Sequence, residues 1–130
     1  MNNRSRIILS IGFISGGLAV VSGAFGAHYL RNILVESGHL ETYKTAVHYH
    51  IIHSVLLVIA GILYHFFPSR KILTIAVLLV AGILLFSGSL YALSLTGNRF
   101  LGMITPFGGI ALIFAWGLLA WNFTGKNKNI

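Results

Sequence analysis

The chain of 130 residues lacks cysteine altogether and contains only two acidic residues, Glu36 and Glu41. The absence of cysteine excludes disulfides, thiol catalysis and the cysteine ligands of iron–sulfur clusters and many zinc sites. Charged residues make up 8% of the chain, whereas a soluble globular domain carries about a quarter. Both acids fall in one predicted loop, so the apolar segments hold no carboxylate that could orient a histidine base for nucleophilic catalysis.

Signatures of nucleotide and nucleic-acid chemistry are also missing from the sequence. The nine lysine and arginine residues stand in ones and twos beside apolar segments and form no basic helix face. The glycine-rich residues 23–27 are not followed by the Lys-Ser/Thr pair of a phosphate-binding loop. Ser87 and Ser89 lack the Gly-x-Ser-x-Gly elbow of a serine hydrolase. We therefore expect no enzymatic activity and no nucleic-acid partner.

What the sequence does contain is a set of long apolar runs, and hydrophobic residues make up 56% of the chain. The runs cover residues 7–27, 46–67, 72–95 and 102–123, and none contains Asp, Glu, Lys or Arg. Each is close to the ~20 apolar residues that a helix needs to cross the ~30 Å hydrocarbon layer of a bilayer. The sequence predicts an all-α bundle of four transmembrane helices that occupies residues 1–130 as a single membrane domain.

The basic residues that flank these runs predict the orientation of the bundle. They divide six to three between the two sides of the membrane. The first side has Arg4, Arg6, Arg70, Lys71, Lys126 and Lys128, and the second has Arg31, Lys44 and Arg99. Because cytoplasmic loops carry the excess of lysine and arginine, both termini are expected in the cytoplasm of a bacterial cell.

Local motifs predict how the helices begin and end. Residues 29–44 are partly amphipathic at helical spacing, which fits either a short interfacial helix interrupted by Gly38 or an ordinary solvated loop. Thr105 and Pro106 fit the first turn of a helix, with a kink one turn into the span as the alternative. Gly97 fits the C-terminal cap of the third span.

Small residues recur at intervals of three, four and seven along three of the spans, which predicts close helix packing. They are Gly12, Gly16, Ala19, Gly23 and Gly26 in the first span, Ala81, Gly88 and Ala92 in the third, and Gly108, Ala111 and Ala115 in the fourth. This pattern favours a structural or accessory protein that packs against itself or against a membrane-protein partner.

Polar residues in the predicted outer half of the bundle are the candidate site. The second span contains His48, His50 and His53, and His50 and His53 share one helix face. The topology places further polar residues at a similar depth, namely His28, Ser87, Ser89, Tyr91, Arg99 and Thr105.

Three interpretations of this polar set remain open. In the first, the side chains only hydrogen-bond one another and fix the packing of the bundle. In the second, His28 together with His50 or His53 binds a metal ion or haem iron. In the third, the set lines a path for protons or a small polar solute. The site hypothesis centres on His28 and His53, supported by Tyr91 and Thr105, and leaves the cofactor unknown.

Four stretches carry a resemblance to a known family. They are GAFGAH at residues 23–28, YHIIH at 49–53, FSGSLY at 86–91 and TPFGG at 105–109. Their order and spacing resemble the domain of unknown function 423 family (UPF0382), small uncharacterised membrane proteins with a relative among small eukaryotic transmembrane proteins. The resemblance implies a multi-pass protein of the bacterial cytoplasmic membrane and brings no biochemical activity with it. It also implies that glutamine is frequent at position 50 and that Arg99 orders the outer loop through Glu36 or Glu41.

Overall fold

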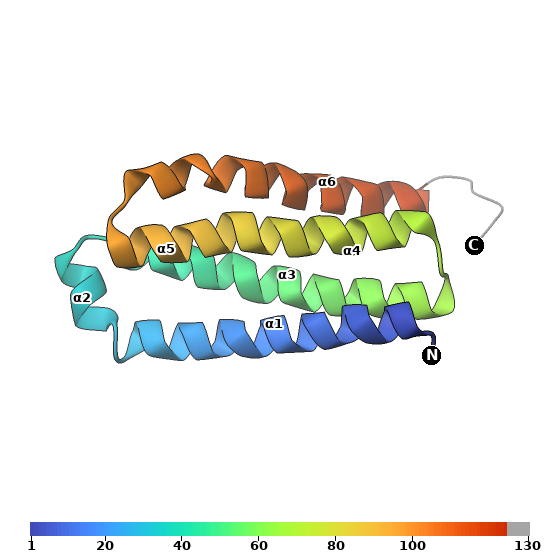
Figure 1. The fold of residues 1–130 in the computed structure, drawn as a ribbon, viewed down its shortest axis with the longest axis horizontal. Helices are drawn as coiled ribbons and strands as arrows, with labels where there is room; N and C mark the ends of the chain where they lie inside the picture. The colour runs from blue at the N-terminus through green and yellow to red at the C-terminus, as the bar shows by residue number, and fades with distance from the viewer. Residues whose placement is uncertain (125–130) are drawn as a thin grey trace.

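The computed structural model describes residues 1–124, which are helical apart from short turns and contain no β-strand (Figure 1). The helices are α1 (Asn3–Ala27), α2 (Arg31–Glu36), α3 (Leu40–Phe66), α4 (Arg70–Gly82), the π-helix η1 (Ile83–Gly88), α5 (Ser89–Thr96), the 3-10 helix η2 (Arg99–Met103) and α6 (Thr105–Thr124). Four stretches are long and apolar enough to cross a membrane, namely Asn3–Ala27, Leu40–Phe66, Arg70–Thr96 and Arg99–Thr124. This confirms the predicted four-helix transmembrane fold.

The helix ends follow the local chemistry of the chain. The Asn2 side chain accepts a hydrogen bond from the Ser5 amide at 2.8 Å, so α1 begins several residues before the predicted apolar run. Of the two alternatives for residues 29–44, the short helix is the one observed, as α2, and Gly38 follows it with φ +75°. Gly97 caps α5 in the left-handed conformation at φ +70°, where a side chain would be strained.

The four rods lie in a fixed order across the bundle. The helix α1 packs along α3, α3 packs on the rod formed by α4, η1 and α5, and α6 packs on α4 and η1. Figure 1 shows α1 and α6 at opposite edges of the molecule. The start of α1 and the end of α6 lie at one end of the bundle, and α2 lies at the other (Figure 1). Lys126 and Lys128, used above to predict orientation, lie outside the described residues.

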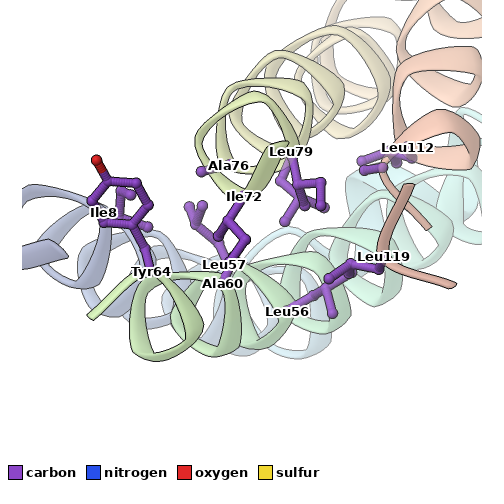
Figure 2. Close-up of a cluster of buried hydrophobic side chains, with 12 residues drawn as sticks. Ile8, Leu56, Leu57, Ala60, Tyr64, Ile72, Ala76, Leu79, Leu112 and Leu119 are labelled. Atoms are coloured by element: carbon purple, nitrogen blue, oxygen red, sulfur yellow. The ribbon is translucent and has the colours of Figure 1, made fainter. Parts of the chain in front are cut away.

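The bundle divides into an apolar half and a polar half. Figure 2 shows the apolar half, where side chains of α3 face those of α4 and α6 close to the end that carries the start of α1. Its fully buried members, each at most 1% exposed, are Leu57, Ala60, Ile72, Ile75, Leu79 and Ala115. The buried His50, Ser87 and Ser89 belong to the half nearer α2, and His53 lies at the midpoint of α3. Ser5, at the start of α1, is a fully buried polar residue of the other half.

The small residues of α1 form the expected close contact with α3. A Cβ atom added to Gly12 would lie 3.0 Å from the Val58 backbone nitrogen. One added to Gly26 would lie 2.7 Å from the Tyr43 ring, and Ala19 between them is fully buried. The seam also holds Gly16, which has looser contact, and Gly23. The glycines thus let the two backbones approach along the polar half as well as the apolar half.

The rod formed by α4, η1 and α5 is the third along the chain. The contact between this third rod and α6 differs in part from the prediction. Gly108 is at the contact as expected, because its added Cβ would lie 2.6 Å from the Leu85 carbonyl carbon. The matching glycine is Gly82, whose Cβ would lie 2.6 Å from Leu112 Cγ. Gly88 departs from the expectation, since a Cβ there would meet nothing within 4 Å. The reason is the π-helical turn, which breaks the regular spacing on which the prediction relied.

Candidate functional site

His50 is the centre of a hydrogen-bonded cluster that joins three helices. Its Nε2 atom lies 3.1 Å from the Ser15 hydroxyl of α1, and its Nδ1 atom lies 3.1 Å from the Tyr91 hydroxyl of α5. Ser15 is also 2.7 Å from the Ser54 hydroxyl, and Ser54 donates to the His50 carbonyl at 2.7 Å. His50 is 8% exposed and Ser54 1%, so these bonds form away from bulk solvent.

The cluster around His50 can satisfy all of its donors with an uncharged imidazole. In the tautomer with hydrogen on Nε2, Tyr91 donates to Nδ1 and Nε2 donates to Ser15. Ser15 then donates to Ser54, and Ser54 donates to the backbone. Buried polar groups cost little when they are all paired, so this cluster can lie inside a membrane without a counter-ion.

His53 belongs to a different cluster, on the side of α3 that faces α6. Its Nδ1 atom donates to the Tyr49 carbonyl at 2.7 Å, and Trp116 Nε1 donates to its Nε2 atom at 3.2 Å. Indole is a donor only, which assigns the single imidazole hydrogen to Nδ1. The two buried histidines therefore contact different helices, although they are three residues apart, and both nitrogens of each ring are occupied.

A groove opens beside the His50 cluster, between α1 and the rod that contains η1. Its volume is about 350 Å³, and its polar lining comes from Ser15, His50, Ser87 and Tyr91. The rest of the lining is aliphatic, with Ile14 of α1 and Leu84 of η1 both about two-thirds exposed. Pockets that hold small molecules combine mostly apolar walls with a few polar groups in this way, from about 300 Å³ upward.

Ser87 is the unusual member of this lining. Its side chain is 1% exposed, and its hydroxyl has no hydrogen-bond partner among the described residues. Burying a hydroxyl without a partner costs about 1–3 kcal/mol. Ser87 lies within the π-helix η1, a type of turn found frequently at functional sites. Rotation about the Ser87 Cα–Cβ bond would turn the hydroxyl toward the groove, where a ligand atom could supply the missing partner.

The remaining candidate residues lie apart from the groove. Ser89 and Thr105 bond each other at 2.7 Å and link α5 to α6, so Thr105 does not support His53. His28 is exposed just after α1 ends, and its side chain joins none of these hydrogen bonds within the described residues. His28 therefore does not meet His53, because the helix ends at Ala27 and the chain turns into α2.

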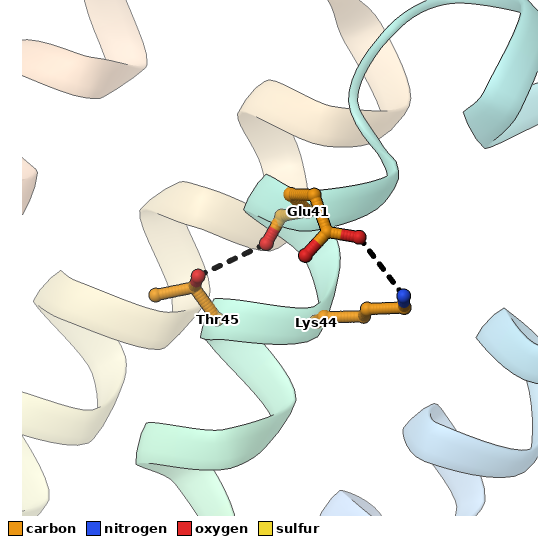
Figure 3. Close-up of polar contacts among 3 residues, drawn as sticks. All are labelled: Glu41, Lys44 and Thr45. Carbon is orange, nitrogen blue, oxygen red and sulfur yellow. Dashed lines mark hydrogen bonds and ion pairs between the residues drawn. The ribbon is translucent and has the colours of Figure 1, made fainter.

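Arg99 also differs from its expected role. It is exposed in η2 and makes no ion pair with any described residue. Glu41 instead pairs with Lys44 one turn along the same helix, with 2.9 Å between Lys44 Nζ and Glu41 Oε1 (Figure 3). The Thr45 hydroxyl donates to the Glu41 carbonyl at 2.9 Å (Figure 3). Glu41 thus pairs with Lys44 and not with Arg99.

Within residues 1–124, no group of three or more His, Asp or Glu side chains is arranged to hold a metal ion.

The structure also reveals site residues that the sequence reasoning missed, namely Ser15, Ser54 and Trp116. Two of them had a usable signal. Ser15 adjoins the glycine seam of α1, and Ser54 follows His50 by one helical turn on a face already marked as polar.

Comparison with known proteins gives a consistent family. The family described as "Protein of unknown function (DUF423)" matches residues 22–109. The UPF0382 membrane protein YwdK of Bacillus subtilis (strain 168) is 41% identical over 112 residues, which cover 85% of this chain and 90% of that protein. A UPF0382 membrane protein of Staphylococcus saprophyticus is 38% identical over 114 residues, covering 88% and 93%. The UPF0382 inner membrane protein YgdD of Escherichia coli (strain K12) is 34% identical over 117 residues, covering 88% and 87%. No solved structure matches the chain.

Proposed function

Because this chain belongs to the DUF423 family of bacterial membrane proteins, for which no chemistry is described, we propose a function from its groove: binding of a lipid-soluble ligand. The protein is a small multi-pass protein of the bacterial cytoplasmic membrane and contacts the lipid bilayer. The groove lies between two membrane-spanning rods, where a ligand dissolved in the bilayer could enter from the side. The proposed activity is binding rather than catalysis.

The single observation that carries the proposal is the unpaired hydroxyl of Ser87 at the edge of an apolar groove. Lipid chains cannot solvate this hydroxyl as water would, so its hydrogen has no acceptor unless a ligand supplies one. A ligand that accepts a hydrogen bond from Ser87 removes this penalty only when it is bound. The same hydroxyl in a bundle built only for packing would bond a carbonyl of its own helix, as Ser94 does with Leu90 at 2.7 Å.

The lining also limits the chemistry of the ligand. Among residues 1–124, no Lys, Arg, Asp or Glu lines the groove, so a charged ligand would lack a counter-ion in a region of low dielectric. The group that meets Ser87 must be an acceptor, such as a carbonyl or ether oxygen, carried on an apolar body that fits between Ile14 and Leu84. We therefore propose an uncharged, oxygen-bearing lipid. This ligand differs from the predicted metal ion, haem, proton or small polar solute, and the site rests on His50, Ser87 and Tyr91 rather than on His28 and His53.

Filling the groove with a side chain is expected to expel the ligand. Gly88 lines the groove, and a Cβ added to it meets nothing within 4 Å, so Gly88→Leu projects into open space without displacing the chain. Protein purified from its native membrane in mild detergent is analysed by native mass spectrometry and by extraction of bound lipid. We expect wild type to retain a neutral lipid and Gly88→Leu to retain it about tenfold less, equivalent to about 1.4 kcal/mol of binding free energy.

The matched control for this experiment is Gly117→Leu. Gly117 lies on α6, outside the groove, and a Cβ added there also meets nothing within 4 Å. The control adds the same apolar side chain to another exposed helix surface and is expected to retain the lipid like wild type. Equal retention by Gly88→Leu and Gly117→Leu, or a wild type that carries no neutral lipid, would refute the proposed function.

A second candidate function is packing of the bundle against a second copy of itself. Gly17 on α1 is exposed, and a Cβ added to it would meet no described atom within 4 Å. Glycine inside a helix is about 1 kcal/mol less favourable than alanine, so it is expected where another backbone comes close. We propose the surface around Gly17 as the contact between copies, which is a specific form of the predicted accessory role.

This second proposal predicts a cross-link between two copies. Because the chain has no cysteine, an introduced cysteine is the only thiol that can form a disulfide. Gly17→Cys provides a single thiol, and mild oxidation in native membranes is expected to convert most of the protein to a disulfide-linked dimer. Ile110→Cys is the control, because Ile110 is 51% exposed on α6 and lies, like Gly17, fourteen residues from the same end of the bundle. Equal cross-linking at both positions, or none at Gly17→Cys, would exclude a contact there.

A further inference from the structure

We infer that a second cavity, at the end of the bundle that carries α2, binds an anionic phospholipid. This cavity has a volume of about 390 Å³ and lies between the end of α1, the start of α2 and the start of α3. It shares no lining residue with the groove beside His50, so the inference does not depend on the proposed function.

The charge at the mouth of this cavity is positive. Arg31 and Lys44 line it together with His48, and no Asp or Glu does. Arg31 makes no ion pair with any residue in the described part of the chain. Lys44 pairs with Glu41, but both side chains are well exposed, at 60% and 83%, and an exposed ion pair of this kind is weak. A phosphate group could bond Arg31 directly and draw Lys44 away from Glu41.

The rest of the cavity is apolar and runs away from the charged end. On α3, Lys44, Val47 and Ile51 follow one another at helical spacing along one face, so the lining changes from basic to aliphatic toward the bundle centre. The opposite wall is α1, where Gly23 packs closely on Val47, since a Cβ added to Gly23 would lie 3.2 Å from Val47 Cγ1. An acyl chain would therefore lie over this apolar seam. An anionic head at one end and an acyl chain along the wall match this order, and a free phosphate ion would leave the apolar part unused.

The location fits such a ligand. The cations lie at the end of the membrane-spanning helices, at the level of the lipid headgroups, where basic residues attract anionic lipids. Arginine can hold a phosphate through two parallel hydrogen bonds, and lysine adds a second point of charge. The cavity therefore combines a specific phosphate contact with an apolar surface, formed by α1 and α3, along which an acyl chain can lie.

The test measures phospholipid binding to the full-length protein by native mass spectrometry. Purified protein is delipidated and titrated with phosphatidylglycerol or with phosphatidylcholine, and inorganic phosphate is added as a competitor. We expect a first phosphatidylglycerol to bind at least tenfold more tightly than phosphatidylcholine. Millimolar phosphate should not displace it. Displacement by phosphate alone would overturn the inference by showing a site for the free ion.

Three charge variants separate this site from general electrostatic attraction. Arg31→Gln is expected to weaken phosphatidylglycerol binding about tenfold. Arg99→Gln removes the same charge at the same end of the bundle but outside the cavity, and is expected to bind like wild type. Glu41→Gln releases Lys44 and should strengthen binding by a few-fold. Equal losses for Arg31→Gln and Arg99→Gln, or weaker binding by Glu41→Gln, would overturn the inference. All three side chains are exposed, so folding should be unaffected, and thermal unfolding checks this.

Discussion

Replacement of Gly108 by alanine should destabilise the protein by about 3 kcal/mol, although it adds only one methyl group. The added Cβ would lie 2.6 Å from the Leu85 carbonyl carbon and 2.8 Å from Phe86 Cα. Both neighbours are backbone atoms of η1, so no side chain can turn aside to make room. Either α6 must move away from the third rod or the π-helical turn must be rebuilt. The loss is measured as the free energy of unfolding during denaturation with SDS in mixed micelles.

The comparison variant for Gly108→Ala is Gly117→Ala on the same helix. A Cβ at Gly117 meets nothing within 4 Å, so the change should be neutral or slightly stabilising, since alanine is about 1 kcal/mol better than glycine in a helix. The opposite signs distinguish a packing clash from a general effect of glycine replacement. If both variants unfolded with the wild-type free energy, the tight contact between α6 and η1 would be wrong.

The sequence predicted the helices well because membrane spanning imposes a length and a composition that can be counted. It also located the seam of α1, since five small residues at regular spacing have one interpretation in lipid. The helix ends were predictable where one or two residues are enough to start or stop a helix. Gly97 has a left-handed backbone, and Thr105 and Pro106 begin α6 without a kink.

Contacts between helices were harder to predict. The topology gives the depth of each residue in the membrane, but it does not say which neighbouring helix that residue faces. In a soluble helix the apolar stripe shows which face is buried, but lipid-facing and buried positions of these helices are equally apolar. His50 and His53 were predicted to share one helix face, yet a small difference in rotation directs one toward α1 and the other toward α6. The π-turn adds a second error, since it shifts every later residue of the third rod relative to regular spacing.

His50→Leu should lower the free energy of unfolding by about 2 kcal/mol because it removes both interhelical hydrogen bonds of the ring. The Tyr91 hydroxyl then has no acceptor in the cluster, while Ser15 keeps only Ser54. His50→Gln should lose less than half as much. A carboxamide oxygen can accept from Tyr91, and its amide can donate to Ser15, in the pattern of the neutral imidazole. The family resemblance, which implies frequent glutamine at this position, agrees with that exchange.

A double-mutant cycle with Ser15→Ala identifies the bond responsible. If the imidazole bonds Ser15 as described, the two changes should be non-additive, with a coupling energy of about 1 kcal/mol for His50→Leu. The same cycle with Ser94→Ala, whose hydroxyl bonds only its own helix, should show no coupling. His50→Gln as unstable as His50→Leu, or additive effects with Ser15→Ala, would mean that size rather than hydrogen bonding matters at position 50. The groove would then lack the hydrogen-bonded polar lining, formed by Ser15, His50 and Tyr91, that distinguishes it from a gap between lipid-facing helices.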